Sequence, residues 1–481
     1  YLRLSDEFNI ENKGKIDATY DVPDPYVNLL SFDGMLKYNS IASQLTDYSG
    51  RHLIDLGIIS KTDSRKLNDA LYQILHTMDK CGLVNQKGYN ILIQLLALKI
   101  YDEKHNDGDL KFYINPDEMN YTALTDDGIQ DFLNRLEKLR EDAKTAYIKI
   151  LSENYFNNAN ANQVKVAIQI VKQFQNYSFT HSERNNLYQL VFYKFASQFS
   201  KADNAQFITP LQIIDFIVDI VNPKHNESII DPTVGIADFL SVSYVKSDGK
   251  LDDTNVYGMD IDEDMVKLAT LNMLLNGDGN ATIEAKSDGL GSILSKFGDD
   301  GKILELVPKT ESRLHNYNGN WDKRVDGKKL KKFDIVLTNP PFGEARSWIP
   351  ADSEKGIAEC YELWNRYKQT KIDMGVIFLE NAFRVLKENG RMAIVLSNSI
   401  ASIDAHTEAR KWLCENMRIV AIVDLPPNIF AEAGVSPTII FAYKPPKKEL
   451  EKLLKSNYQV FSREIKKVGY EVKTKNKVKY F

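Results

Sequence analysis

Cysteine is scarce in this chain of 481 residues, with only Cys81, Cys360 and Cys414, which lie far apart in the sequence. They form no CxxC pair and no metal-ligand spacing, so the sequence predicts neither a disulfide framework nor a metal site. Long apolar runs are also missing, since no stretch approaches the roughly 20 residues of a membrane span. There is no secretory leader pattern, and these features predict a cytoplasmic protein. The first residue is Tyr1 rather than Met, so we expect the true N-terminus to be missing.

The chain also lacks an excess of positive charge. Its 61 Lys and Arg and 66 Asp and Glu give a net charge of −5, which disfavours a protein that grips DNA alone over a long surface. The charge is uneven, however. Residues 444–481 contain twelve Lys or Arg and four Glu, a net of +8, which leaves −13 on the rest. Such a basic tail is typical of a solvated end, and also of a segment that contacts a partner.

What the chain does contain divides into two parts. Residues 1–200 include ALYQILHTMDKCGL and DFLNRLEKLREDAKTAYIKIL, whose apolar residues recur at three- and four-residue spacing and predict a helical domain. After Phe207, short β-rich runs alternate with helical stretches. This alternation predicts an α/β domain over 201–445 with a mainly parallel sheet covered on both faces. Residues 446–481 then form the basic tail.

The α/β region offers a specific set of strands. The pattern MGVIFLENAFRVLKENG predicts a helix between two of them that ends at Gly390. The charged stretch from Ser292 to Lys332 is long for a connection and is typical of a functional or surface insertion. Because ligands of parallel sheets bind beyond the carboxyl ends of the strands, the residues that follow each strand are candidates for a site. The predicted strands are Ser228–Asp231, Asn255–Asp260, Ala281–Ala285, Phe333–Leu337, Arg391–Leu396, Ile419–Leu425 and Thr438–Tyr443.

Acidic and glycine residues follow the first three of these strands. DPTVGIADFL begins with Asp231 and turns at Gly235, where backbone N–H groups and a helix N-terminus can face a ligand. Asp260 ends the second strand, 25 residues beyond Gly235, where a carboxylate suits ribose hydroxyls; capping of the next helix by Asp260 or Asp262 is the alternative. Asp288 follows the third strand and suits an adenine amino group. Together they predict a crevice for an adenosine-bearing cofactor.

The fourth strand is followed by the motif NPPF. Pro340 and Pro341 restrict the backbone and lack N–H donors, so we expect the Asn339 amide oxygen and the Pro340 carbonyl to face outward as two acceptors. An exocyclic amino group has two N–H donors to match, and holding both leaves its nitrogen lone pair free to attack. We expect Phe342 to stack on the base, worth about 1–3 kcal/mol. The protein then contributes positioning and desolvation rather than a strong base.

These stretches resemble the N6-adenine DNA methyltransferases that use S-adenosylmethionine, and most of all the modification subunit of type I restriction–modification systems. The segments FITP, DPTVGIADFL, TNPPFG and FLENAFRVLKENGRMAIVLSNS carry the resemblance, which spans 207–444. It implies a Rossmann-like domain with a seven-stranded sheet, and methylation of an adenine flipped out of double-stranded DNA. It also implies a DNA specificity subunit as a partner, together with a second copy of the chain and a restriction subunit.

The resemblance assigns roles residue by residue. Two departures concern the turn: its second glycine is Ala237, whose methyl group we expect to crowd the cofactor's methionine end, and Asp238 stands where many relatives have a small or uncharged residue.

The implied catalytic residues are Asn339, Pro340, Pro341 and Phe342. The implied S-adenosylmethionine site comprises Phe207, Thr209, Pro210, Asp231, Thr233, Gly235, Asp260, Ile261, Asp288 and Gly289.

Three other interpretations remain open. Protein-glutamine methyltransferases also carry an NPP motif, usually ending in Tyr, and Phe342 and the FITP segment disfavour them. A non-catalytic scaffold of a restriction or phage-defence complex fits the change at Ala237, although the intact NPPF argues against it. The third is the methyltransferase part of a fused restriction–methylation enzyme. The ExK triplet Glu284-Ala285-Lys286 lies at the end of a predicted strand, so the sequence predicts no nuclease within this chain. The nuclease of such a fused enzyme would lie before Tyr1.

Overall fold

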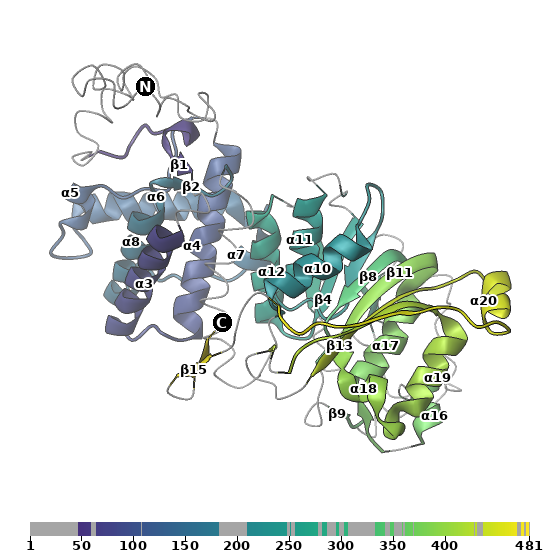
Figure 1. The fold of residues 1–481 in the computed structure, drawn as a ribbon. Coiled ribbons are helices and arrows are strands. Elements are labelled where there is room, and N and C mark those ends of the chain that lie inside the picture. The colour runs from purple at the N-terminus through teal and green to yellow at the C-terminus, as the bar shows by residue number, and fades with distance from the viewer. Residues whose placement is uncertain are drawn as a thin grey trace, which may run out of the picture. The chain divides into compact units, whose positions relative to one another are not determined.

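The structure is a computed structural model in which the chain divides into two compact units, Tyr1–Lys194 and Phe195–Phe481 (Figure 1). The helices between residues 64 and 174 lie in the first unit, and the predicted domain boundaries stay predictions. The described residues are 47–58, 64–106, 108–181, 209–247, 251, 255–277, 281–285, 295–297, 303–305, 332–341, 347–350, 358, 361–368, 370–427, 429–430, 436–468, 473–475 and 478–480.

The first unit is built from helices that pack around α4 (Gln86–His105), whose residues 91–100 are all buried. The continuous burial explains why this segment reads as apolar on every side. The Asn160 side chain accepts the N–H groups of Asn162 and Gln163 and caps α8. The other elements are η2 (Leu53–Asp55), β1 (Gly57–Ile58), α3 (Ser64–Lys80), α5 (Pro116–Met119), α6 (Asp127–Lys144), α7 (Ile148–Leu151), α8 (Ala161–Phe174) and β2 (Tyr177–Ser178).

Two buried acids of α4 bind backbone N–H groups of neighbouring loops. Glu103 forms an ion pair of 2.8 Å with Lys99 and accepts the N–H of Phe179 at 2.9 Å. Asp102 accepts the N–H of Phe112 at 2.8 Å. Buried carboxylates need such partners because an unpaired charge is costly away from water. These acids therefore serve the fold of the helical unit.

The second unit contains one eight-stranded sheet in the order β14-β12-β13-β11-β8-β3-β4-β5. Every pair in it is parallel except the two that β13 makes, so the prediction of a mainly parallel sheet is confirmed. The predicted number of seven strands is wrong, because a strand of the basic tail pairs with β12 at the edge. The strands are β3 (Ile229–Asp231), β4 (Val256–Asp260), β5 (Thr282–Ala285), β8 (Phe333–Thr338), β11 (Leu386–Ser397), β12 (Arg418–Asp424), β13 (Pro437–Tyr443) and β14 (Phe461–Glu464).

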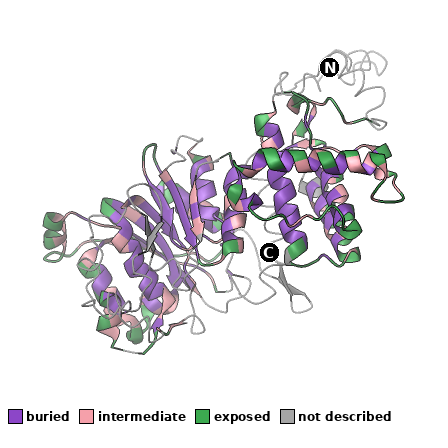
Figure 2. Cartoon of the chain, turned by 180° about the vertical axis from the view of Figure 1, so that it is seen from behind, coloured by how far each residue is buried: buried purple, intermediate pink, exposed green. Residues whose placement is uncertain are grey.

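Two apolar cores pack on the two faces of this sheet, and its strands are mostly buried (Figure 2). Val336 of β8 belongs to one core, while its neighbours Ile335 and Leu337 belong to the other. This division follows from the alternation of side chains along a strand. The first core is covered by α16 (Glu362–Tyr367), α17 (Met374–Val385) and α19 (Thr407–Asn416), and the second by α10 (Leu211–Val221), α11 (Asp238–Lys246) and α12 (Glu263–Leu275).

The helix before β11 ends earlier than predicted, at Val385 rather than at Gly390. Leu386 already pairs with Phe333 of β8. Gly390 has a different role from a helix end, since a Cβ there would lie 2.9 Å from the Leu386 side chain and 3.0 Å from the Asp334 carbonyl. The glycine therefore permits close approach of the chain, which the sequence pattern does not distinguish from a helix end.

The remaining elements are short. Most of the stretch from Ser292 to Lys332 lies outside the described residues, apart from a paired β6 (Ser295–Phe297) and β7 (Ile303–Glu305). Every helix in the described part of the chain is too short or too polar to cross a lipid bilayer. The other short elements are β9 (Ser347–Trp348), β10 (Ile372–Asp373), α18 (Asn398–Ser402), η9 (Asp404–His406), α20 (Lys447–Leu453), β15 (Lys473–Lys475) and β16 (Val478–Tyr480).

Candidate active site

The turn between β3 and α11 is held against β4 by its own backbone. The N–H of Val234 donates to the carbonyl of Met259 at 2.8 Å. Gly258 of β4 leaves room for this approach, because a Cβ there would lie 2.6 Å from Val234 Cγ2. Gly235 has a φ of +51°, and no atom lies within 4 Å of where its Cβ would be. The turn is therefore open on the side where a Gly235 side chain would lie.

Ala237 adopts a left-handed conformation, with a φ of 63°, directly before α11. Glycine is the residue that adopts this conformation without a steric penalty. The alanine side chain is fully buried and belongs to the apolar core that α10 and α11 cover. The methyl group therefore packs into the protein, and the expectation that it crowds a cofactor is not supported.

Asp260 at the end of β4 braces the same turn. Its carboxylate accepts the N–H of Gly235 at 2.9 Å and the N–H of Asp262 at 3.0 Å. Asp262 in turn caps α12 by accepting the N–H of Asp264 at 2.8 Å, so the capping role predicted for Asp260 or Asp262 belongs to Asp262. Burial raises the pKa of Asp260 to about 6. Its contact with ribose hydroxyls stays a prediction.

Asp231 at the end of β3 connects two strands through a hydroxyl network. It accepts the Thr338 hydroxyl at 2.8 Å and the Thr233 N–H at 3.0 Å, and the two threonine hydroxyls lie 2.6 Å apart. Burial raises the pKa of Asp231 to about 7, although these hydrogen bonds oppose the shift. The network holds the turn after β3 beside the end of β8.

Asn339 follows β8 at the same edge of the sheet. Its amide nitrogen donates to the Thr209 hydroxyl at 2.9 Å. Its amide oxygen is enclosed and has no hydrogen-bond partner. The sequence predicts an outward-facing oxygen, and the structure instead has a covered one. Buried polar atoms without partners are rare in folded proteins, and each one calls for an explanation.

The predicted site residues fall into three groups. The first comprises residues that are hydrogen-bonded in pairs at the carboxyl edge of the sheet: Thr209 with Asn339, Asp231 with Thr233, and Gly235 with Asp260. Ile261 is exposed, Pro340 is buried and Pro341 is half-buried, and Pro210 is buried directly before α10. Phe207, Asp288, Gly289 and Phe342 lie outside the described residues.

Sequence reasoning missed two residues that hold the site together. Thr338 is fully buried and joins Asp231 to the end of β8. Asn272 of α12 is fully buried, and its amide nitrogen donates to the Ile236 carbonyl at 2.6 Å. The available signal was an amide side chain inside the largely apolar run LATLNMLL, since a buried amide needs a specific partner.

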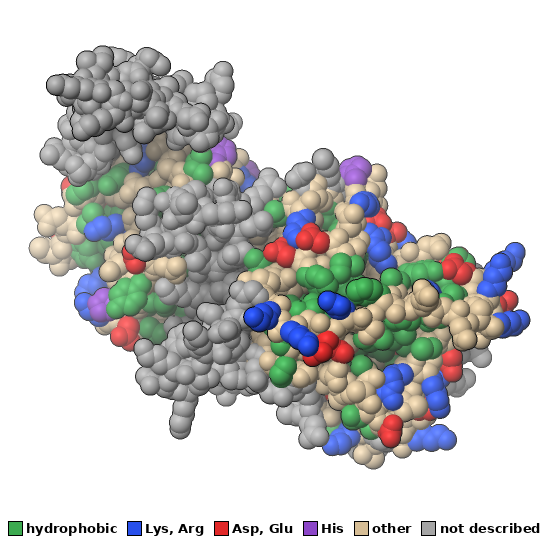
Figure 3. All heavy atoms as spheres, viewed as in Figure 1, with side chains coloured by type: hydrophobic (Ala, Val, Ile, Leu, Met, Phe, Trp, Pro, Cys, Tyr) green, Lys and Arg blue, Asp and Glu red, His purple; other side chains and the backbone are tan. Residues whose placement is uncertain are grey.

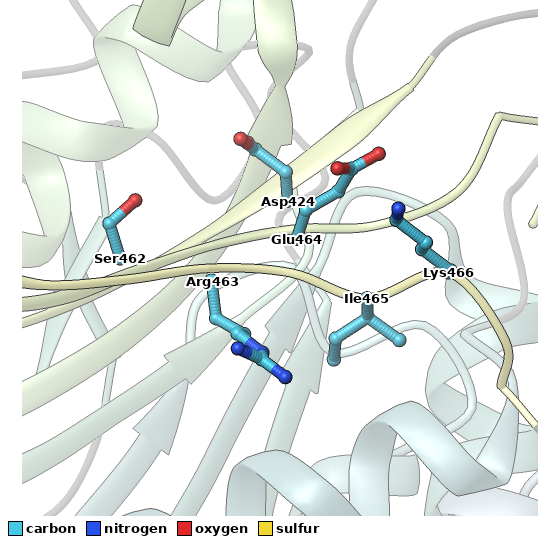
Figure 4. A pocket seen from close by; sticks show the side chains of 6 residues that line it. All are labelled: Asp424, Ser462, Arg463, Glu464, Ile465 and Lys466. Carbon is cyan, nitrogen blue, oxygen red and sulfur yellow. The ribbon is translucent and has the colours of Figure 1, made fainter.

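A separate hollow of 770 Å³ lies beside the outermost strand of the sheet, where β12 and β14 end. Figure 4 shows Glu464 and Lys466 on one side of the strand and Arg463 and Ile465 on the other. Three strands, β12, β13 and β11, lie between β14 and β8 in the sheet. This hollow is therefore distinct from the Asn339 site.

The fold and the site define the class of protein. A mainly parallel sheet with a glycine turn after β3, an acid after β4 and an Asn-Pro-Pro segment after β8 is the arrangement expected of a methyltransferase that acts on an amino nitrogen. The sequence profile described as N-6 DNA Methylase matches residues 184–479. The chain belongs to this family.

Individual relatives agree with the family. Over 288 residues the chain is 26% identical to the type I restriction enzyme EcoEI methylase subunit of Escherichia coli, covering 57% of this chain and 50% of that protein. It is 25% identical to the StySJI methylase subunit of Salmonella typhimurium, covering 78% of this chain and 66% of that protein. The chain thus spans about half to two thirds of the length of these relatives.

A solved structure shares the fold. The type I restriction-modification system methyltransferase subunit from Streptococcus thermophilus superposes with a TM-score of 0.50 and 18% identity, covering 82% of this chain and 92% of that one. At this identity the likeness supports the architecture alone.

Proposed function

We propose that this chain is an adenine-specific N6 DNA methyltransferase that works as the modification subunit of a type I restriction–modification complex. The observation that carries the chemistry is the Asn339 amide, whose nitrogen is held by Thr209 and whose oxygen lacks a partner. An exocyclic amino group supplies the donor that this oxygen lacks. Family membership and the names of the matched relatives support adenine in DNA as the substrate.

The residues at the turn fit S-adenosylmethionine. The open space at Gly235 allows a ligand to approach the backbone, and the acid at Asp260 stands at the strand end where a ribose binds. Thr209, Gly235 and Asp260 would hold this cofactor, and Phe207, Asp288 and Gly289 are assigned to it by their sequence motifs. When bound, the cofactor supplies an activated methyl group on a sulfonium.

The chain's own residues then position the base. The Asn339 oxygen accepts one hydrogen of the amino group, and the Pro340 carbonyl is proposed to accept the other. Phe342 is proposed to stack on the ring. The amino group becomes acidic as it attacks, so no strong base is required, and the main contribution is orientation. Because the Asn339 oxygen is enclosed without ligand, entry of a flipped base requires neighbouring segments to move aside.

We further propose that DNA is bound together with a specificity subunit. On the face in Figure 3, Lys and Arg side chains are interspersed with Asp and Glu rather than gathered in one continuous patch. With a net charge of −5, the chain is poorly suited to bind DNA alone. A partner that reads the sequence supplies the missing contacts, and the matched relatives are named as subunits of restriction enzymes.

The test is transfer of a tritiated methyl group from labelled S-adenosylmethionine to DNA, with a candidate specificity subunit present. We expect label in N6-methyladenine for the parent chain and at least a hundredfold loss for Asn339→Ala. Asn457→Ala, in an exposed segment, is the matched control and should retain activity. Label that appears in a protein substrate instead of DNA favours the glutamine methyltransferase interpretation. No transfer to either, with the cofactor bound, favours the scaffold.

A further inference from the structure

Asp238 is the one described carboxylate with a buried oxygen that has no hydrogen-bond partner. The residue is 6% exposed and begins α11, directly after the turn at Gly235 and Ala237. The other two acids of this region differ, since Asp231 accepts from two threonines and Asp260 accepts from two backbone N–H groups. Of these three acids, Asp238 is therefore the one with a buried oxygen free to accept a hydrogen bond from a ligand.

The position of Asp238 at the start of α11 indicates the direction of its side chain. In an α-helix each Cα–Cβ bond tilts toward the N-terminus, so the first residue of α11 directs its carboxyl group toward the turn and the carboxyl edge of the sheet. The N-terminus of this nine-residue helix faces the same way. The orphan oxygen and the proposed cofactor surface at Gly235 thus share one end of α11.

The surroundings of Asp238 make an unpaired charge expensive. Residues 239–244 of α11 are buried and mostly apolar, including Phe239 and Leu240. Burial raises the pKa of Asp238 well above its ordinary value. A carboxyl group in this position is held protonated, or it is paired with a cationic donor. Because an acceptor oxygen needs an N–H donor, a sulfonium does not satisfy it, whereas an ammonium group does.

We propose that Asp238 binds the α-ammonium group of the cofactor's amino-acid portion, a contact that rests on the proposed S-adenosylmethionine site. The chain thereby replaces a small residue of the turn with a charged anchor for the ligand. Asp238 acts as a binding residue, and the reacting atoms stay with Asn339. The adenosine portion is left to the strand-end acid Asp260.

The test compares two ligands by isothermal titration calorimetry on the full chain. S-adenosylhomocysteine carries the ammonium group, and 5′-methylthioadenosine lacks the whole amino-acid portion. We expect Asp238→Asn to weaken S-adenosylhomocysteine binding about 10- to 100-fold, the range for a lost charge-assisted hydrogen bond. Binding of 5′-methylthioadenosine should change less than about twofold, which is within the range of minor contacts.

The matched control is Glu263→Gln, which changes an exposed acid at the first position of α12. It should leave both affinities unchanged. The ligand-free Asp238→Asn chain should melt no lower than the parent, because the substitution removes a buried acid. Equal loss of both ligands, unchanged S-adenosylhomocysteine binding, or unfolding of Asp238→Asn would each overturn the proposal. Failure of the parent chain to bind either ligand would overturn the cofactor assignment itself.

Discussion

A single hydrogen bond decides which atom of the Asn339 amide is left without a partner. The amide nitrogen donates to the Thr209 hydroxyl at 2.9 Å, so the oxygen is the atom that remains available. Sequence motifs assign Thr209 to the cofactor, and the structure adds a contact with Asn339, the residue proposed to hold the amino group. At the scale of one residue, a hydrogen bond between Thr209 and Asn339 thus links the FITP segment to the NPPF motif.

Thr209→Val should impair catalysis more than cofactor binding. Without the hydroxyl the amide is free to rotate, and loss of a hydrogen bond worth about 1 kcal/mol corresponds to a several-fold lower rate. Thr209→Ser keeps the hydroxyl and should retain most of the activity. Single-turnover methyl transfer and calorimetric cofactor affinity, measured on the same samples, separate the two effects. A valine variant with an unchanged rate and weaker cofactor binding would instead place Thr209 at the cofactor alone.

Asp231 should give the ligand-free protein a characteristic pH dependence. Burial raises its pKa from 3.8 to about 7, so the unfolded chain releases this proton at a lower pH than the folded chain. The free energy of unfolding therefore falls as pH rises from about 4 to about 7, and it levels off above that window. Asp231→Asn keeps an acceptor for Thr338 and removes the titration.

Urea denaturation of the parent and Asp231→Asn across that window measures this contribution. The parent should lose a few kcal/mol relative to the variant as pH rises. A difference between the two proteins that stays constant with pH would show that Asp231 titrates normally.

At the scale of elements, the turn between β3 and α11 is held by contacts from both β4 and α12. Its backbone bonds to β4, its acid partner comes from the end of β4, and the Ile236 carbonyl is held by Asn272 of α12. Strand β4 and the helix after it, α12, therefore both hold the conformation of this turn. This redundancy explains how a left-handed Ala237 is tolerated.

Gly235→Ala should reduce both stability and cofactor binding. A left-handed alanine costs about 1–2 kcal/mol, and the added methyl group enters the open space of the proposed site. Gly50→Ala is the matched control, since Gly50 also has a positive φ of +66° and no atom within 4 Å of its Cβ position. Both variants should lose similar stability in thermal melts, and Gly235→Ala alone should weaken S-adenosylhomocysteine binding. Equal binding by the two variants would exclude ligand contact at Gly235.

At the scale of the whole molecule, the basic tail is partly a structural element. It contributes β14 to the sheet, and β14 runs parallel to β12, so it ends at the same sheet edge as the Asn339 site. Lys466 and Lys467 follow that end and are exposed. α20 follows the antiparallel β13 and thus lies toward the opposite edge.

Charge reversal should distinguish the contributions of two lysine pairs of the tail to DNA binding. Lys466→Glu with Lys467→Glu should weaken DNA binding and lower the slope of log affinity against log salt by about 2, if each lysine contacts one phosphate. The control pair, Lys447→Glu with Lys448→Glu on α20, carries the same charge change at the opposite edge and should bind nearly as the parent does. Both are measured by fluorescence anisotropy with the specificity subunit present. Equal effects of the two pairs would mean that only net charge matters.

Predictions from the sequence succeeded where local pattern and tertiary environment agree. All seven predicted strands are present, because strands buried on both faces read as short apolar runs between turn residues. The predicted helix before β11 is too long. Leu386 is apolar and suits a helix or a strand, and its pairing with Phe333 places it in β11. The eighth strand was missed because β14 is exposed along its length and carries no apolar alternation.

The amino-acid sequence by itself determined the α/β class, the order of the strands along the chain, and the acid, glycine and Asn-Pro-Pro segments at the strand ends, because these follow from periodicity and backbone restriction. Only the tertiary structure decided which side-chain atoms are engaged: Asp231 with Thr338, Asp260 with Gly235, Asn339 with Thr209, and Asp238 with no partner. These pairings join residues as far as 130 positions apart. A hydrogen bond depends on the separation of two atoms in space, which the chain acquires only on folding.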